Sequence, residues 1–124
     1  MNRVFDKDAA LERMAFDAQL FREMIDLLRE DGPRRLRTLS AGLDAGDWPR
    51  VHQAAHSLKG LAANFNATRT VAAAAEVEKL ARSGERGGLV PAVAELRSAL
   101  EELLAELRPH AEGSAPRRES AARR

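Results

Sequence analysis

The sequence predicts an all-α fold, an antiparallel four-helix bundle with a short additional helix at its N-terminus. The 124 residues suffice for one compact domain, and 44% of them are hydrophobic, which favours a single core. Aromatic residues are scarce, with four Phe, one Trp and no Tyr, while Ala, Leu, Arg and Glu dominate and favour helix. Apolar residues also recur at helical spacing between capping and breaking residues.

Two aspartates are placed to start the first helices. Asp6 can cap a short helix that ends near Met14, and Asp17 can cap a second helix, because a carboxylate at this position accepts a hydrogen bond from the first turn. The helical spacing of apolar residues supports the second helix, which carries Leu20, Phe21, Met24, Ile25 and Leu28.

A glycine and a proline predict the next boundary. Gly32 and Pro33 interrupt the second helix, and Pro33 suits the first turn of a third helix that ends within residues 44–47. Asp47 then starts a fourth helix, over about residues 48–65. The apolar positions of the third helix are Leu36, Leu39 and Leu43.

The last two helices follow a tight reversal. Asn66 tolerates the left-handed conformation of a helix end, and Thr68 can cap a fifth helix that ends in the glycine-rich loop 83–88. Pro109 closes the last helix. This helix has one continuous apolar seam, formed by Leu89, Val93, Leu96, Leu100, Leu103 and Leu107. Long helices with short connections favour an antiparallel bundle.

Composition excludes several classes of protein. Without Cys there is no disulfide framework, thiolate metal site or thiol nucleophile, as suits a cytoplasmic protein. No signal peptide or apolar run of membrane-spanning length is present, so we expect a soluble, cytoplasmic monomer with no membrane partner. The net charge of +1 gives no field for nucleic acid. We expect residues 1–110 to form the bundle and the Arg-rich tail, residues 111–124, to be disordered.

One histidine is predicted to lie on the surface of the fourth helix. His56 lies roughly 140° from the centre of the core stripe at about 100° per residue. Lys59 and Gly60 follow one turn further along, with Ala63 beyond them. Together these residues predict a shallow docking surface on which a partner could bring a charged group to the imidazole. The core stripe consists of Val51, Ala55, Leu58, Ala62 and Phe65.

The segment "AAHSLKG" resembles the signature of histidine-containing phosphotransfer domains, roughly His-x-Leu-Lys-Gly within a four-helix bundle. The resemblance covers about residues 5–108: "FDKDAALERM" is similar to the short leading helix of the family, and Glu78 matches the Glu of its usual "LE". The sequence departs from the family at two positions. Asn66 stands where the family has Gly, ten residues after the histidine, and Val77 replaces Leu before Glu78.

The resemblance implies a phosphoryl carrier without turnover of its own. His56 would accept a phosphoryl group from an aspartate of one response-regulator receiver domain and pass it to another. Lys59 would stabilise the charge on the phosphoryl oxygens, and Gly60 would leave room for the receiver. No cofactor is implied for this chain, because the magnesium belongs to the partner. The receivers' kinase could be a hybrid histidine kinase, and the chain could be a free-standing shuttle or a terminal module of such a kinase.

Two side chains are candidates for supporting the imidazole. Glu78 and His56 lie eleven residues on either side of Ala67, which puts them at the same height on antiparallel helices. Glu78 could therefore orient the ring, the alternative being a solvated carboxylate. Gln53, one turn before His56, could hydrogen-bond the ring or an arriving phosphate.

Other interpretations remain open from the sequence. His52 and His56 have the i, i+4 spacing of helical zinc sites, but Gln53 stands where such a site carries its general-base Glu and no third ligand is evident. Gly60 could serve close helix packing, since Gly in a helix costs about 1 kcal/mol relative to Ala and so needs a reason. The bundle could also dock a receiver domain without transferring a phosphoryl group.

Overall fold

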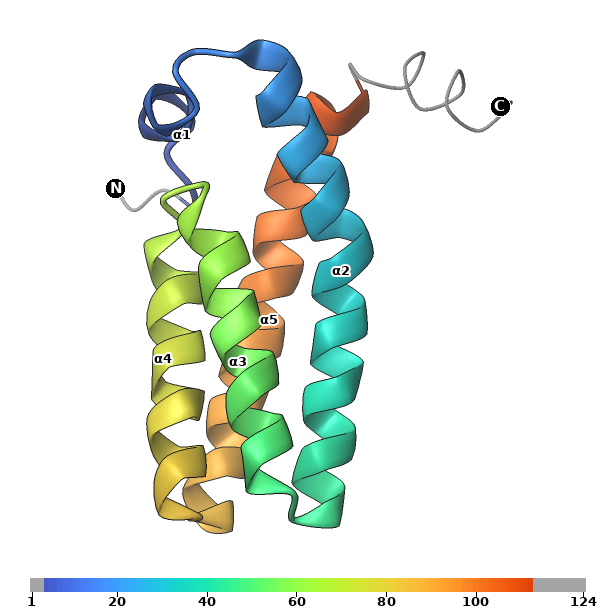
Figure 1. The fold of residues 1–124 in the computed structure, drawn as a ribbon, viewed down its shortest axis with the longest axis vertical. Coiled ribbons are helices and arrows are strands. Elements are labelled where there is room, and N and C mark those ends of the chain that lie inside the picture. The colour runs from blue at the N-terminus through green and yellow to red at the C-terminus, as the bar shows by residue number, and fades with distance from the viewer. Residues whose placement is uncertain (1–3, 113–124) are drawn as a thin grey trace, which may run out of the picture.

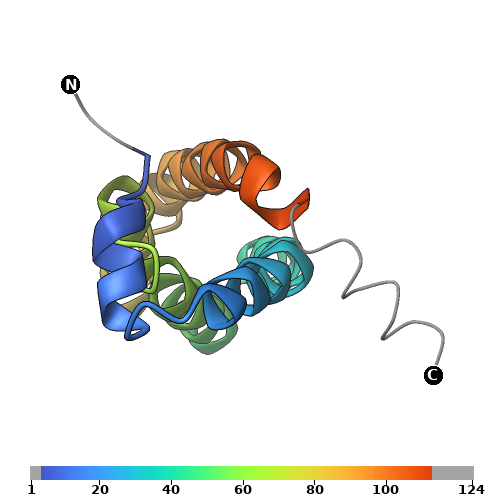
Figure 2. The same ribbon diagram turned by 90° about the horizontal axis from the view of Figure 1, so that it is seen from above.

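The computed structural model describes residues 4–112, which form five helices. Four long helices form an up-and-down antiparallel bundle, and the short α1 lies over the ends of α3 and α4 (Figures 1 and 2). Neighbours along the chain pack side by side, and α2 and α5 close the bundle. The helices are α1 (Lys7–Arg13), α2 (Ala18–Ala45), α3 (Trp48–Ala63), α4 (Thr68–Ser83) and α5 (Arg86–Glu112).

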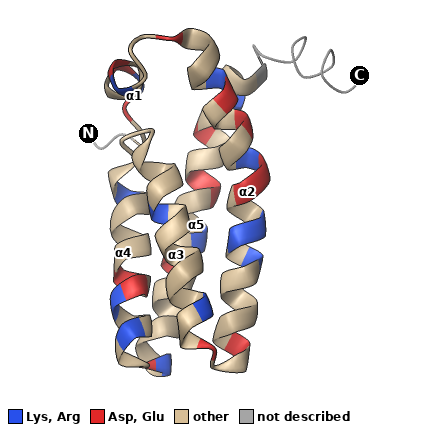
Figure 3. Cartoon of the chain, in the orientation of Figure 1, with Lys and Arg blue, Asp and Glu red and all other residues tan. Residues whose placement is uncertain are grey.

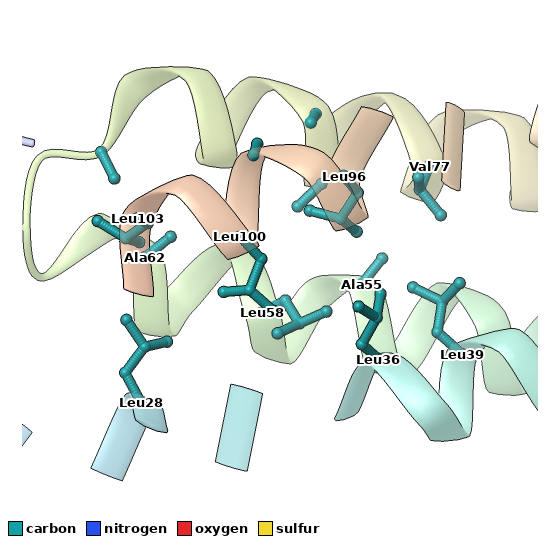
Figure 4. Packing of buried hydrophobic residues seen from close by; sticks show 14 of the residues in the cluster. Leu28, Leu36, Leu39, Ala55, Leu58, Ala62, Val77, Leu96, Leu100 and Leu103 are labelled. Carbon is teal, nitrogen blue, oxygen red and sulfur yellow. The ribbon is translucent and has the colours of Figure 1, made fainter. Parts of the chain in front are cut away.

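The core contains the predicted apolar stripes. Side chains from all four long helices meet along the bundle axis, as seen for Leu36, Leu58 and Leu100 (Figure 4). All five core residues predicted for the segment 48–65 are fully buried, although Phe65 lies just beyond the end of α3. The apolar seam of α5 is also buried, with no residue more than 3% exposed. Burial of this kind stabilises a fold by about 25 cal/mol per Å² of apolar surface.

Three predicted aspartate caps are present. The side chains of Asp6, Asp17 and Asp47 accept hydrogen bonds from backbone N–H groups three residues ahead, at 3.0–3.2 Å. Asn66 has a φ of 54°, which is the predicted left-handed conformation, and Gly84 has a φ of 70°, so both reversals around α4 use this conformation. These two turns set how α4 lies against its neighbours α3 and α5.

The predicted break at Gly32 and Pro33 is wrong. Both residues lie inside α2, so the expected second and third helices are one helix of 28 residues. Gly32 is itself buried, and a Cβ there would be in ordinary contact, 3.5 Å, with Leu28 and Leu100. The apolar stripe therefore continues through the break, and its packing against α5 outweighs the roughly 3 kcal/mol that an interior Pro costs.

Three other boundaries differ from the sequence prediction. Thr68 does not cap α4, because the N-cap is Ala67 and no side chain caps this end. Gly87 and Gly88 lie in the first turns of α5, not in a loop. Pro109 does not end α5, which continues to Glu112, two residues beyond the expected limit of the bundle. The predicted disorder of the tail beyond Glu112 concerns residues outside the described part of the chain.

The position of α1 depends on the reversal between α3 and α4. The Asp6 N–H donates to the carbonyl of Phe65 at 3.0 Å, and the Arg13 Nε donates to the Asn66 side-chain oxygen at 3.0 Å. The ring of Phe65 packs edge-on against Phe5 and Phe21. Within residues 4–112, no helix combines the length and the apolar character that a membrane span requires.

Candidate functional site

His56 lies on the outer surface of α3 and faces α4. Its side chain is 67% exposed, whereas Ala55 and Leu58 beside it on the helix are fully buried. The outward direction predicted from the helical stripe is therefore confirmed. The ring is held at one edge only, because its Nδ1 lies 2.8 Å from Oε2 of Glu78 on α4, and the rest of the imidazole is open to a partner.

Glu78 is a buried carboxylate that joins the two helices. Only 6% of the residue is exposed, so the alternative that it is solvated is wrong. Its Oε2 contacts His56, and its Oε1 lies 2.6 Å from Nζ of Lys59. One carboxylate thus holds both the histidine and the lysine of the motif, and the equal heights predicted for His56 and Glu78 correspond to a direct contact.

The two contacts keep this carboxylate ionised. Burial by itself raises the pKa of Glu78, but the hydrogen bonds from Lys59 and His56 outweigh burial and leave the pKa below its ordinary value. An ionised carboxylate can only accept hydrogen bonds. The Nδ1 of His56 therefore carries a proton and donates a hydrogen bond to Glu78, and the lone pair of a neutral ring lies on Nε2.

The other motif residues lie around this contact. Gly60 is exposed, and a Cβ added to it would meet no atom within 4 Å, so helix packing does not explain this glycine. Ala63 lines a shallow groove between α3 and α4 together with Val71 and Ala72. Gln53 is exposed and makes no hydrogen bond to the ring among the described residues, so the structure does not bring it onto His56.

His52 lies one turn below His56, and the two rings are parallel with their centroids 6.5 Å apart. Nη2 of Arg82, on α4, lies 3.3 Å from Nε2 of His52. Because a guanidinium only donates, this ring nitrogen is the acceptor and points its lone pair at Arg82. No group of three or more metal-ligating side chains occurs among residues 4–112, and the zinc alternative finds no support there.

Sequence reasoning missed Arg82. The residue lies four positions after Glu78, so it is on the same face of α4, and this spacing is the signal that could have drawn attention to it. In Figure 3 the ribbon of α4 is coloured for Lys or Arg towards its C-terminal end, beyond a stretch coloured for Asp or Glu. A groove with a volume of about 840 Å³ lies there, lined by residues that include Trp48, His52, Gln53 and Arg82.

The profile of the Hpt domain matches residues 23–108. The chain therefore belongs to the Hpt domain family, the histidine phosphotransfer proteins of phosphorelays, which carry phosphoryl groups.

One solved structure shows the same fold. The crystal structure of histidine-containing phosphotransfer protein B (HptB) from Pseudomonas aeruginosa PAO1 aligns with a TM-score of 0.82 at 22% identity, covering 90% of this chain and 97% of that chain. At this identity the likeness supports the fold alone. A search of the curated proteins gave no significant match.

Proposed function

We propose that this protein relays a phosphoryl group between the aspartates of response-regulator receiver domains, with Nε2 of His56 as the carrier atom. The proposal depends above all on the contact between His56 Nδ1 and Glu78, 2.8 Å long, beside a ring that is 67% exposed. Fixing the proton on Nδ1 directs the nucleophilic lone pair of Nε2 towards solvent and an incoming partner.

The transfer step balances without a cofactor on this chain. Nε2 attacks the phosphorus of a phospho-aspartate, an N–P bond forms, the P–O bond to the aspartate breaks, and the carboxylate leaves with its electron pair. The ring then carries additional positive charge, which the ionised Glu78 stabilises through Nδ1–H. The reverse step gives the phosphoryl group to the next aspartate. Magnesium, where it is needed, would be bound by the receiver domain.

Lys59 supplies a positive charge beside the carrier histidine, because both side chains contact Glu78. Its ammonium lies 2.6 Å from Glu78, and an ammonium has three donors, so it can keep this contact while it turns another N–H towards a phosphoryl oxygen. In a loose transition state the charge lies on those oxygens. Gly60, next to it and open to solvent, leaves space for the loops of a docked receiver.

Phosphorylation of the full chain tests the proposal. A phosphorylated receiver domain should give the protein a label that is labile in acid and stable in alkali, and His56→Gln should abolish it without loss of the fold, because the ring is exposed. The fold is checked by circular dichroism. Label that survives in His56→Gln would remove His56 as the carrier, and binding of the receiver without any label in the wild type would favour a docking module.

A further inference from the structure

A second cation contacts the histidine one turn from the carrier and has no counter-ion among the described residues. Arg82 is four residues after Glu78 on α4, a spacing and order that favour an ion pair. Yet both oxygens of Glu78 are engaged, one by Lys59 and the other by His56. In the described part of the chain Arg82 makes no ion pair, and its guanidinium donates instead to the Nε2 of His52.

This contact is weaker than the other charged contacts on α4. The distance from Arg82 to His52 is 3.3 Å, and the acceptor is an imidazole nitrogen that carries no charge while it accepts. Lys59, by comparison, lies 2.6 Å from a buried carboxylate. Charge-assisted hydrogen bonds to a carboxylate are roughly twice as strong as neutral ones, so Arg82 can leave its partner more easily than Lys59 can.

The position of Arg82 puts it within reach of the carrier atom. The ring of His52 is one helical turn from that of His56 and parallel to it, and Oε2 of Glu78 is 3.8 Å from the Nε2 of His52 and 2.8 Å from the Nδ1 of His56. Neighbours one turn apart are about 5–6 Å from each other. Arg82 is exposed to solvent, so a change of its rotamer can carry the guanidinium from the ring of His52 towards that of His56.

Charge balance supplies the reason for such a movement. Before phosphorylation, the single negative charge of Glu78 is matched by Lys59. A phosphoryl group on His56 adds about −1.5 to −2 charges. Lys59 is already paired with Glu78, so the added charge needs a further cation. Arg82 contacts the neighbouring ring of His52, and no carboxylate among the described residues holds its charge. Its planar guanidinium can bind two phosphoryl oxygens at once.

We propose that Arg82 is a phosphoryl-binding residue, held on His52 while the protein is unphosphorylated and transferred to the phosphoryl group once His56 carries it. This inference rests on the proposed function, since it assumes that His56 is the carrier. It adds a binding partner for the phosphoryl oxygens on the side of the ring opposite to Lys59.

The test uses phosphoramidate, a small donor that loses ammonia as the N–P bond to His56 forms, so that no receiver has to dock. Arg82→Ala should lower the initial rate of labelling by about tenfold, and Arg82→Lys should lower it less. Arg69→Ala is the matched control, because it removes the same charge from the same helix on the side that faces Glu95 and Glu102, and it should stay within twofold of wild type.

The nitrogen chemical shift of the His52 ring gives a readout of the movement itself. Phosphorylation of the wild type should shift the His52 Nε2 signal towards that of a nitrogen without a donor, and Arg82→Ala should show this position before phosphorylation. An unchanged His52 signal, or equal labelling of Arg82→Ala and wild type by phosphoramidate, would overturn the proposal. A defect seen only with the receiver would make Arg82 a docking residue. Label in His56→Gln would instead refute the proposed function.

Discussion

Two charged clusters on opposite sides of α4 are built in opposite ways. Towards α3, the buried carboxylate of Glu78 holds Lys59 and His56. Towards α5, the exposed guanidinium of Arg69 is shared by Glu95 and Glu102, at 3.0 and 2.6 Å. The first cluster has one acid for two basic side chains, and the second has one base for two acids.

Burial decides what each cluster can do. Water surrounds the Arg69 cluster, so its ion pairs are screened and contribute little, although the hydrogen bond that Arg69 donates to Glu95 raises the pKa of Arg69. Glu78 has lost most of its water, so its two donors are needed and their positions are constrained. The α3 side therefore holds an exposed imidazole in a defined orientation, whereas the α5 side satisfies its own charges.

Removing the cation from each cluster gives the largest expected contrast. Lys59→Ala should slow phosphoryl transfer by about 10- to 100-fold, because a stabilising charge is lost and Glu78 keeps only His56. Arg69→Ala should leave the rate nearly unchanged. Rapid-quench kinetics with a phosphorylated receiver measures the rate, and titration calorimetry shows whether receiver binding is kept. Equal slowing by both variants would point to the overall charge of the protein instead of this contact.

The open glycine beside the first cluster tests the docking surface. Gly60→Gln should weaken receiver binding by about tenfold, because its side chain would stand where the receiver approaches. Gly87 of α5 is also exposed, with no atom near its missing Cβ, so Gly87→Gln is a matched control that should bind normally. If calorimetry gives the two variants the same affinity, the surface around Gly60 is not the docking site.

The α3–α4 reversal sets the register of the first cluster and has no part in the second. Asn66→Val should lower the free energy of unfolding by about 1–2 kcal/mol, since a β-branched residue is strained at a φ of 54°. Asn66→Gly should be close to neutral. Glycine has no strain in the left-handed conformation, and this gain offsets the loss of the hydrogen bond from Arg13. Urea denaturation measures both. A harmless Asn66→Val would mean that this turn does not constrain α3 against α4.

Periodicity predicted the bundle because large apolar side chains define a helical face without ambiguity. The stripe around Leu58 on α3 also determined that His56 points outward. The error at Pro33 arose because local propensity was given more weight than a stripe that continues past it, through the buried Gly32. Tertiary packing overrides propensity where both flanking segments bury the same face.

The burial of Glu78 could not be predicted in the same way. α4 contains the run Ala72–Ala75 between Val71 and Glu76, and alanines occur both inside and outside a bundle, so the rotation of this helix is poorly defined by sequence. The sequence predicts that Glu78 lies at the same height as His56, but it does not predict the contact between the two side chains. The contact between Arg82 and His52 depends on both oxygens of Glu78 being occupied, which only the three-dimensional arrangement shows.

The smallest expected effect concerns the pH dependence of stability. Hydrogen bonds lower the pKa of both Glu78 and Glu95, in Glu78 against an opposing effect of burial. A carboxyl group with a lowered pKa in the folded state stabilises the protein above its unfolded pKa, and this contribution is lost as the pH falls through the folded pKa. The stabilisation is therefore present at neutral pH and disappears in acid.

Comparing Glu78→Gln with Glu95→Gln separates the two clusters. Glu78→Gln should lower the free energy of unfolding at pH 7 by on the order of 1 kcal/mol, as for a buried hydrogen-bonded charge, and its difference from wild type should shrink below the ordinary glutamate pKa. Glu95→Gln should change stability less at every pH, because the pair with Arg69 is exposed and screened by water. Denaturation curves collected from pH 7 to pH 3 provide the measurement. Equal pH profiles for the two variants would contradict the argument, since burial would then not distinguish Glu78, which holds His56, from the exposed Glu95.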